Sequence, residues 1–229
     1  MKKLTLIYTF CLLASVTLLA QKNNKDNSAR DKAVQSDRIV LISTSLGDMT
    51  VKLYNATPKH RDNFIKLAKE NFYDSLLFHR VISNFMIQGG DPLSKHAAPG
   101  DQLGNGDNGY TIPAEFVDTV FHRKGALCAA RTDNPEKASS GCQFYIVQGQ
   151  VLTNEQVSMM EQQRGIKLND KQKQVYTTVG GSPWLDGGYT VFGEVTNGLD
   201  VIDKIGSVKT APGDRPLQNV YILKVTVLK

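Results

Sequence analysis

A series of short strand-like pieces, separated by glycine and asparagine, runs through most of the chain and limits the folds open to it. Alternating apolar and polar residues are typical of strands with one buried face, and the alternation is clearest over 49–54 and 223–227. Many short strands favour a closed antiparallel barrel or a sandwich. Because the first and last strands are both strongly patterned, pairing them would remove exposed edges, which favours the closed barrel. The other strand-like pieces lie at 76–82, 85–89, 125–131, 143–148 and 190–196.

Two helices are predicted among these strands. Thr57 followed by Pro58 is typical of a helix start, with Thr57 as the N-cap, and an apolar face continues to about Asn71. A second helix is predicted over 199–205, with Gly206 as its stop. The body of the chain is therefore predicted to be mainly β.

Residues 150–180 differ from the rest because they are polar, rich in glutamine and poor in strand-forming residues. Thr153 with Gln156 matches a capping box, and Val157 and Met160 fall on one face of the helix that would follow. We therefore predict a helical insertion of one or two short helices between strands.

Residues 1–20 have the pattern of a secretory signal peptide: a basic start, an uncharged apolar run over 4–20, and a small residue, Ala20, before a polar stretch. We expect cleavage after Ala20, with an uncleaved membrane anchor as the alternative. Residues 21–37 predict a flexible polar linker, so one domain is expected over 38–229. This organisation predicts a periplasmic or secreted protein that has no membrane contact beyond the signal segment.

The composition argues against several classes of function. There are 27 Lys and Arg residues against 22 Asp and Glu, with no basic run of five, so nucleic acid is not expected as a partner. The four histidines follow no metal-ligand spacing, and the glycine-rich stretch 100–109 lacks the aspartate spacing and final glutamate of a calcium loop. No metal or cofactor is therefore predicted. Cys128 and Cys142 are expected to be buried thiols, with a disulfide left open as the alternative.

Three blocks of the sequence combine uncommon patterns: FHRVISNFMIQGGD at 78–91, GALCAAR and GCQFYIV within 125–147, and WLDGGYTVFGEV at 184–195. Together they resemble the cyclophilins, a family of peptidyl-prolyl cis-trans isomerases, and in particular secreted bacterial members. The resemblance runs from about Ile39 to Lys229, apart from the insertion. It implies an eight-stranded antiparallel barrel closed at both ends by two helices, with a substrate groove on the outer wall.

The resemblance also implies roles for single residues. Arg80 falls at the family's catalytic arginine, and Phe85, Met86 and Leu185 fall in the pocket that receives the proline ring. In many members a third aromatic residue, usually phenylalanine, completes this pocket. Here that residue is Tyr145, whose hydroxyl requires a hydrogen-bond partner or water.

Further residues are implied to lie along the substrate groove. Gln88 and Gln143 fall at positions that hydrogen-bond the substrate backbone. Ala130 and Arg131 match the stretch beside the peptide residues that precede proline, where many members have asparagine in place of Arg131. Trp184 matches the rim tryptophan that is associated with cyclosporin binding.

One further residue departs from the family pattern, and two residues are assigned to a side of their strand by alternation. A groove histidine found in many members is Tyr189 here. Strand alternation places Phe144 on the side opposite Tyr145, so Phe144 is assigned to the core. By the same reasoning His79 points away from its neighbour Arg80, and it is interpreted as structural.

The expected chemistry needs only a hydrogen-bond donor and an apolar slot. Rotation about a peptide bond faces a barrier of ~18–20 kcal/mol because the nitrogen lone pair is delocalised into the carbonyl. A permanently charged arginine near that nitrogen stabilises the twisted state without a nucleophile, metal or base. The expected partners are proline-containing peptides, unfolded exported proteins and cyclosporin-like ligands, and a monomer is expected. The alternative is a cyclophilin-like module that binds proline-containing segments without turnover, and the insertion is hypothesised to be a flap that selects clients.

Overall fold

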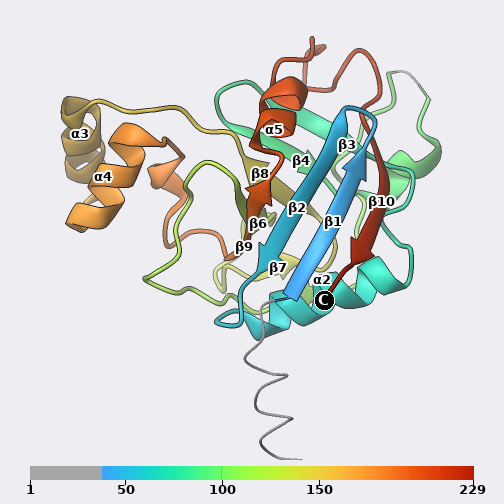
Figure 1. Ribbon diagram of the computed structural model, residues 1–229, viewed down its shortest axis with the longest axis horizontal. Helices are drawn as coiled ribbons and strands as arrows, with labels where there is room; N and C mark the ends of the chain where they lie inside the picture. Colours follow the sequence, from blue (N-terminus) through green and yellow to red (C-terminus); the bar gives the residue numbers. More distant parts are fainter. Residues whose placement is uncertain (1–37, 99) are drawn as a thin grey trace, which may run out of the picture. The chain divides into compact units, whose positions relative to one another are not determined.

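Eight strands of the described part of the chain close into an antiparallel barrel, which confirms the predicted fold class (Figure 1). The computed structural model describes residues 38–98 and 100–229, so the predicted signal peptide and linker lie outside the described residues. Within those residues no helix is long and apolar enough to cross a bilayer. In order around the barrel the strands are β1 (Arg38–Thr44), β10 (Tyr221–Val227), β3 (Leu76–Ile82), β4 (Met86–Gly89), β8 (Phe144–Val147), β6 (Ala126–Ala129), β9 (Val191–Asn197) and β2 (Gly47–Leu53).

The first and last strands close the barrel, as the sequence predicts. β1 pairs with β2 on one side and with β10 on the other, and both pairings are antiparallel. The predicted strand boundaries agree with the observed ones to within two residues. A separate small sheet of β5 (Thr111–Ile112) and β7 (Ser139–Ser140) was not predicted, because strands of two residues carry no alternating pattern.

Side chains that point inward fill the barrel with an aromatic core. The ring of Phe64 lies 4.9 Å from that of Tyr73 and 5.5 Å from that of Phe144, measured between ring centroids. Phe144 is 1% exposed, which confirms its assignment to the core. Because a barrel of eight strands is filled by its own side chains, a substrate has to bind on the outside of the wall.

Two helices lie at opposite ends of the barrel in Figure 1: α2 (Pro58–Lys69) and α5 (Leu199–Gly206). α2 packs against β9 and β10, and α5 packs against β2, β3 and β4. Their apolar faces belong to the same core cluster as the inward side chains of the strands. Two short 3-10 helices, η1 (Pro92–His96) and η2 (Pro183–Leu185), lie in the loops between strands.

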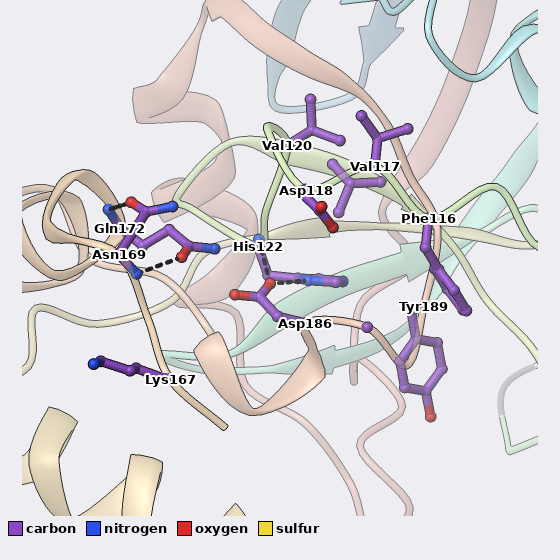
Figure 2. Close-up of a pocket in the computed structure, with 12 residues that line it drawn as sticks. Phe116, Val117, Asp118, Val120, His122, Lys167, Asn169, Gln172, Asp186 and Tyr189 are labelled. Carbon is purple, nitrogen blue, oxygen red and sulfur yellow. Dashed lines mark hydrogen bonds and ion pairs between the residues drawn. The ribbon is translucent and has the colours of Figure 1, made fainter. Parts of the chain in front are cut away.

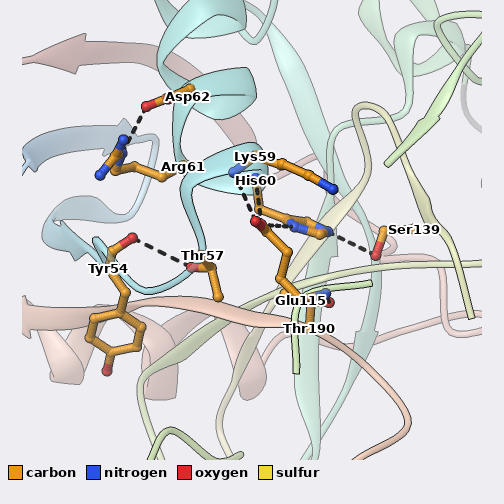
Figure 3. Close-up of polar contacts among 9 residues, drawn as sticks. All are labelled: Tyr54, Thr57, Lys59, His60, Arg61, Asp62, Glu115, Ser139 and Thr190. Carbon is orange, nitrogen blue, oxygen red and sulfur yellow. Dashed lines mark hydrogen bonds and ion pairs between the residues drawn. The ribbon is translucent and has the colours of Figure 1, made fainter. Parts of the chain in front are cut away.

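The N-terminus of α2 is capped by a residue that is distant in the sequence. Thr57 occupies the predicted N-cap position, but its side chain makes no capping hydrogen bond. Instead, the carboxylate of Glu115 accepts hydrogen bonds from the backbone N–H groups of Lys59 (3.1 Å) and His60 (3.0 Å), as Figure 3 shows. A carboxylate at this position also interacts favourably with the positive end of the helix dipole.

His60 connects this cap to the small sheet. Its Nδ1 lies 2.7 Å from Glu115 Oε2, and its Nε2 lies 3.0 Å from Ser139 Oγ (Figure 3). A serine, a histidine and a carboxylate in this order resemble a nucleophilic site, but Ser139 and His60 are only 1% and 2% exposed. The series is therefore closed to substrates and joins segments of the fold. Burial lowers the pKa of His60, although Glu115 acts to raise it.

The insertion contains two helices, as predicted: α3 (Asn154–Arg164) and α4 (Asp170–Thr178). The predicted capping box of Thr153 and Gln156 is present at the start of α3, and a second capping box starts α4. Capping boxes satisfy the free N–H groups at a helix start, which explains how a segment so polar forms two short helices.

Close backbone contacts hold the base of the insertion. A Cβ atom at Gly149 would lie 2.4 Å from the Cα of Gly181, and Gly149 has a φ of +62°, so only glycine fits there. The two helices also share a small apolar cluster with the adjoining loop. Its buried members are Phe121, Leu152, Val157, Leu168 and Tyr176.

The two cysteines of the described chain, Cys128 and Cys142, are free and buried, as predicted. Burial raises the pKa of Cys128 well above its ordinary value and raises the pKa of Cys142 to about 11. Both side chains are therefore thiols at neutral pH and act as small apolar groups.

Candidate active site

A row of paired residues on the outer wall of the barrel forms the floor of the candidate site. Arg80 on β3 pairs with Gln88 on β4, and Gln88 pairs with Tyr145 on β8. Tyr145 pairs in turn with Cys128 on β6. Residues opposite one another in a sheet share a face, so this row lies on one surface. Alternate residues such as Ile146 point into the core instead.

A β-bulge in β3 sets the direction of Arg80. The register between β3 and β4 shifts between Phe78 and Arg80, so His79 is the extra residue. Phe78 and His79 are both buried, whereas Arg80 is exposed. Arg80 lines the pocket on the outer wall. The side to which His79 points stays a prediction, because the extra residue of a bulge interrupts the alternation.

Most of the residues implied by the resemblance line one pocket on this wall, with a volume of about 210 Å³. They come from three distant parts of the sequence that the barrel brings together. The apolar ones pack in a cluster of their own, outside the barrel core. The lining residues are Arg80, Phe85, Met86, Gln88, Ala130, Arg131, Tyr145, Leu185 and Tyr189.

The side chain of Arg80 is 44% exposed and is held at one edge by Asp214. Its Nε donates a hydrogen bond of 3.2 Å to Asp214 Oδ2. An ion pair this exposed contributes little to stability. Its consequence is geometric: the pair orients the guanidinium and leaves the terminal nitrogens as the donors for a ligand in the pocket.

Comparison with known proteins identifies the family. The family model described as cyclophilin type peptidyl-prolyl cis-trans isomerase/CLD matches residues 39–227. The chain is a cyclophilin. A relative from Staphylococcus aureus (strain USA300), named as a peptidyl-prolyl cis-trans isomerase, is 37% identical over 199 residues, which cover 86% of this chain and 95% of the relative. A relative of the same name from Staphylococcus saprophyticus is 34% identical over 191 residues, 83% of this chain and 91% of the relative. The cyclophilin is thus an isomerase by family.

Solved structures agree with this assignment at the level of the fold. A cyclophilin type peptidyl-prolyl cis-trans isomerase from Cryptosporidium parvum superposes with a TM-score of 0.62 and 21% identity, covering 85% of this chain and 99% of that protein. The same protein, solved in the presence of the dipeptide Ala-Pro, gives a TM-score of 0.60 and 22% identity, covering 83% and 99%.

In this cyclophilin Gln143 lies beside the pocket, in an adjoining cavity of about 550 Å³ that shares Gln88 with it. The side-chain N–H groups of Gln143 donate to the carbonyls of Gly104 (2.9 Å) and Gly106 (2.7 Å). Its Oε1 accepts a hydrogen bond of 3.0 Å from Gln88 Nε2. Both the oxygen and the nitrogen of the Gln143 amide are hydrogen-bonded within the protein, so Gln143 holds Gln88 in place. Gln88 lines the pocket and is therefore the one of the two that can contact a substrate there.

Aromatic rings and a guanidinium form the rim of the pocket. Trp184 does not line the pocket, but its ring lies 5.9 Å from that of Phe85. The Arg131 guanidinium lies over the Tyr189 ring at 4.8 Å, and Arg131 Nε donates to the carbonyl of Gly188 at 3.0 Å. These contacts fix Tyr189 as a wall of the pocket.

Three residues beside the site were not predicted: Asp214, which holds Arg80, and His122 and Asp186, which lie behind Tyr145. Asp186 belongs to the WLDG block, so a signal existed for it. His122 and Asp214 lie in loops, where periodicity gives no information. No group of three or more His, Cys, Asp or Glu side chains that could hold a metal occurs among the described residues.

Proposed function

We propose that this cyclophilin catalyses rotation about X-Pro bonds in unfolded exported proteins, with Arg80 as hydrogen-bond donor and the apolar pocket as the seat of the proline ring. The observation that carries the proposal is the position of Arg80. It is half exposed on the outer wall and lines the same pocket as Phe85 and Met86. An arginine turned into the core, or separated from the pocket, could not act on the same residue that the pocket grips.

The expected rate increase sets the free energy by which the site has to stabilise the twisted peptide bond. A rate increase of ~10⁵-fold corresponds to a twisted state favoured over the planar one by ~7 kcal/mol. When the bond twists, the lone pair becomes localised on the proline nitrogen, and a charge-assisted hydrogen bond from Arg80 stabilises it. Gripping the ring while the rest of the chain turns supplies the remainder. No bond is broken and no proton is transferred.

The pocket remains apolar even though one of its walls is a tyrosine. Tyr145 is 5% exposed, and its Oη lies 3.0 Å from Nε2 of His122. The hydroxyl therefore has its partner behind the pocket wall, and the ring presents carbon atoms to the proline. This arrangement supports a role for Tyr145 in place of the usual phenylalanine.

The proposed ligands are proline-containing peptides, and the Ala-Pro dipeptide used with the neighbouring Cryptosporidium parvum structure supports this class. The position of Trp184 beside Phe85 supports a cyclosporin-like ligand at the rim. The pattern of residues 1–20 supports export, and we propose that the protein works in the periplasm or outside the cell. A monomer is proposed as well.

The test is a prolyl isomerisation assay on a short proline-containing peptide, comparing the protein with its Arg80→Ala variant. We expect kcat/KM to fall by about 10²-fold or more, the size of effect seen when one preorganised donor is removed. The free energy of unfolding should change by less than about 1 kcal/mol, because the pair with Asp214 is half exposed. A control is Lys224→Ala, which removes a cation at an exposed position of β10 outside the pocket and should keep full activity.

Two results would contradict the proposal. Full activity in the Arg80→Ala variant would remove the donor role from Arg80. An unmodified protein that binds the peptide but does not accelerate its isomerisation would instead be the binding module that the sequence left as the alternative.

A further inference from the structure

A buried tyrosine connects the insertion to the barrel wall. Tyr176 lies on α4 and is 0% exposed, and its hydroxyl donates a hydrogen bond of 2.6 Å to Asp186 Oδ2. Asp186 follows η2 directly and is the neighbour of Leu185, which lines the proline pocket. A residue in the insertion's own apolar cluster thus contacts a residue adjacent to the substrate site.

Asp186 in turn holds His122, as Figure 2 shows. Its Oδ1 accepts hydrogen bonds from the backbone N–H of His122 at 2.9 Å and from Nδ1 at 2.7 Å. A carboxylate is only an acceptor, so Nδ1 carries a proton, and in the tautomer with its single ring proton there Nε2 is the acceptor. The hydroxyl of Tyr145, 3.0 Å away, therefore donates to Nε2.

These hydrogen bonds form a continuous series that ends at the Asp186 carboxylate from both sides. Tyr145 donates to His122, His122 donates to Asp186, and Tyr176 donates to Asp186 from the other side. The rings of His122 and Tyr145 are nearly parallel, 14° apart, with centroids separated by 6.1 Å. Burial raises the pKa of both tyrosines, so each keeps the proton that it donates.

We propose that the insertion is part of the substrate-binding machinery, because Tyr176 and Asp186 hold His122, which orients the Tyr145 ring in the wall of the proline pocket. The inference rests on the proposed function. It makes Tyr176, Asp186 and His122 positioning residues, since only Tyr145 among the four lines the pocket. The insertion then affects the binding of even the shortest peptides, because it acts on the pocket wall from behind.

The hydroxyl of Tyr176 can be removed without detaching the insertion. Backbone hydrogen bonds hold its base: Ser182 N donates to His122 O at 2.8 Å, and Gly181 N donates to Gln150 O at 3.1 Å. The aromatic ring that remains after Tyr176→Phe still fills the apolar cluster. The variant therefore isolates one hydrogen bond from the packing of α4.

The experiment is a double-mutant cycle in the peptide isomerisation assay, with Tyr176→Phe, Tyr145→Phe and both together. Tyr176→Phe alone should raise KM about three- to tenfold, the range of one hydrogen bond, and change kcat by less than about twofold. With Tyr145→Phe already present the series is broken, so adding Tyr176→Phe should leave KM unchanged. A purely structural role would give the same effect of Tyr176→Phe in both backgrounds.

The matched control is Tyr221→Phe, which removes an exposed hydroxyl on β10 that accepts a hydrogen bond from Asn219 and should leave KM unaltered. An unchanged KM in Tyr176→Phe, or an equal increase with and without Tyr145→Phe, would overturn the inference while leaving the proposed function intact. An unmodified protein without isomerase activity would contradict the proposed function itself. Urea unfolding of each variant shows whether a loss of activity comes from a loss of fold.

Discussion

Acid should destabilise the fold through His79, the buried neighbour of Arg80 on β3. His79 is 3% exposed. Apart from a weak contact with the Leu77 backbone, neither ring nitrogen has a hydrogen-bond partner among the described residues. Burial is the main cause that lowers the pKa of His79 to about 4, with Asp91 opposing the change and Arg215 reinforcing it. The native fold therefore holds this ring neutral in conditions where an unfolded chain would protonate it.

The size of the effect follows from the two pKa values. In the unfolded chain the pKa of a histidine is about 6.5, so the difference from His79 is about 2.5 units, and at 1.36 kcal/mol per unit this corresponds to about 3 kcal/mol. The unfolded state binds the proton first as pH falls. Stability is therefore complete above about pH 6.5, decreases as pH falls below this value, and reaches its full loss near pH 4. His60 acts in the same direction, because burial lowers its pKa too.

The assay is urea unfolding at pH 7.5 and pH 4.5 for the protein and its His79→Gln variant. Between pH 7.5 and pH 4.5 the free energy of unfolding of the variant should fall by about 2–3 kcal/mol less than that of the unmodified protein. This difference does not depend on the variant's stability at pH 7.5. His96→Gln, at an exposed position in η1, is the matched control and should behave as the unmodified protein. The reasoning is refuted if His79→Gln loses as much stability on acidification as the unmodified protein.

Two further predictions concern activity. Isomerisation of a short peptide should be nearly independent of pH from about 6 to 9, because arginine stays charged and burial raises the pKa of Tyr145 well above its ordinary value; a bell-shaped profile of kcat/KM would contradict a mechanism without proton transfer. Asp214→Asn should lower kcat/KM about two- to fivefold by loosening Arg80, and the difference from the unmodified protein should shrink in 1 M salt, where exposed charges are screened. An effect of Asp214→Asn that is unchanged by salt would argue against an electrostatic role.

Alternation explains why so much of the barrel was predictable from the sequence. In a strand each residue's side is fixed by its neighbours, so the pattern places Phe144 and Tyr145 on opposite sides, and the resemblance assigns Tyr145 to the pocket. The local rule does not extend to His79 and Arg80, because the bulge at His79 interrupts the alternation just before Arg80.

The parts that were not predictable depend on contacts between loops. The N-cap of α2 is an example, because Thr57 matches the expected pattern while the capping hydrogen bonds come from Glu115. The partners of Gln143 are another, since they are backbone carbonyls of a glycine-rich loop whose sequence says only that it turns. Asp214 reaches Arg80 from a segment 134 residues later. Such pairings are set by tertiary structure and leave no periodic trace.

The two faces of the barrel wall carry different residues, and this explains how a rigid barrel accommodates the site. Inward residues such as Ile146 maintain the fold, and their outward neighbours on the same strands, including Tyr145, form the pocket. Substituting an exposed pocket residue such as Arg80 should therefore cost little stability, whereas Met86 is buried in the cluster behind the pocket and its truncation should cost more. Tyr145 is the position where this separation fails, because its hydroxyl leads through His122 and Asp186 to the insertion. Replacing a pocket phenylalanine by tyrosine adds one buried hydroxyl that must be satisfied, and here the satisfying group is supported by Tyr176. The Tyr145 hydroxyl and the helices of the insertion are thus joined by one series of hydrogen bonds.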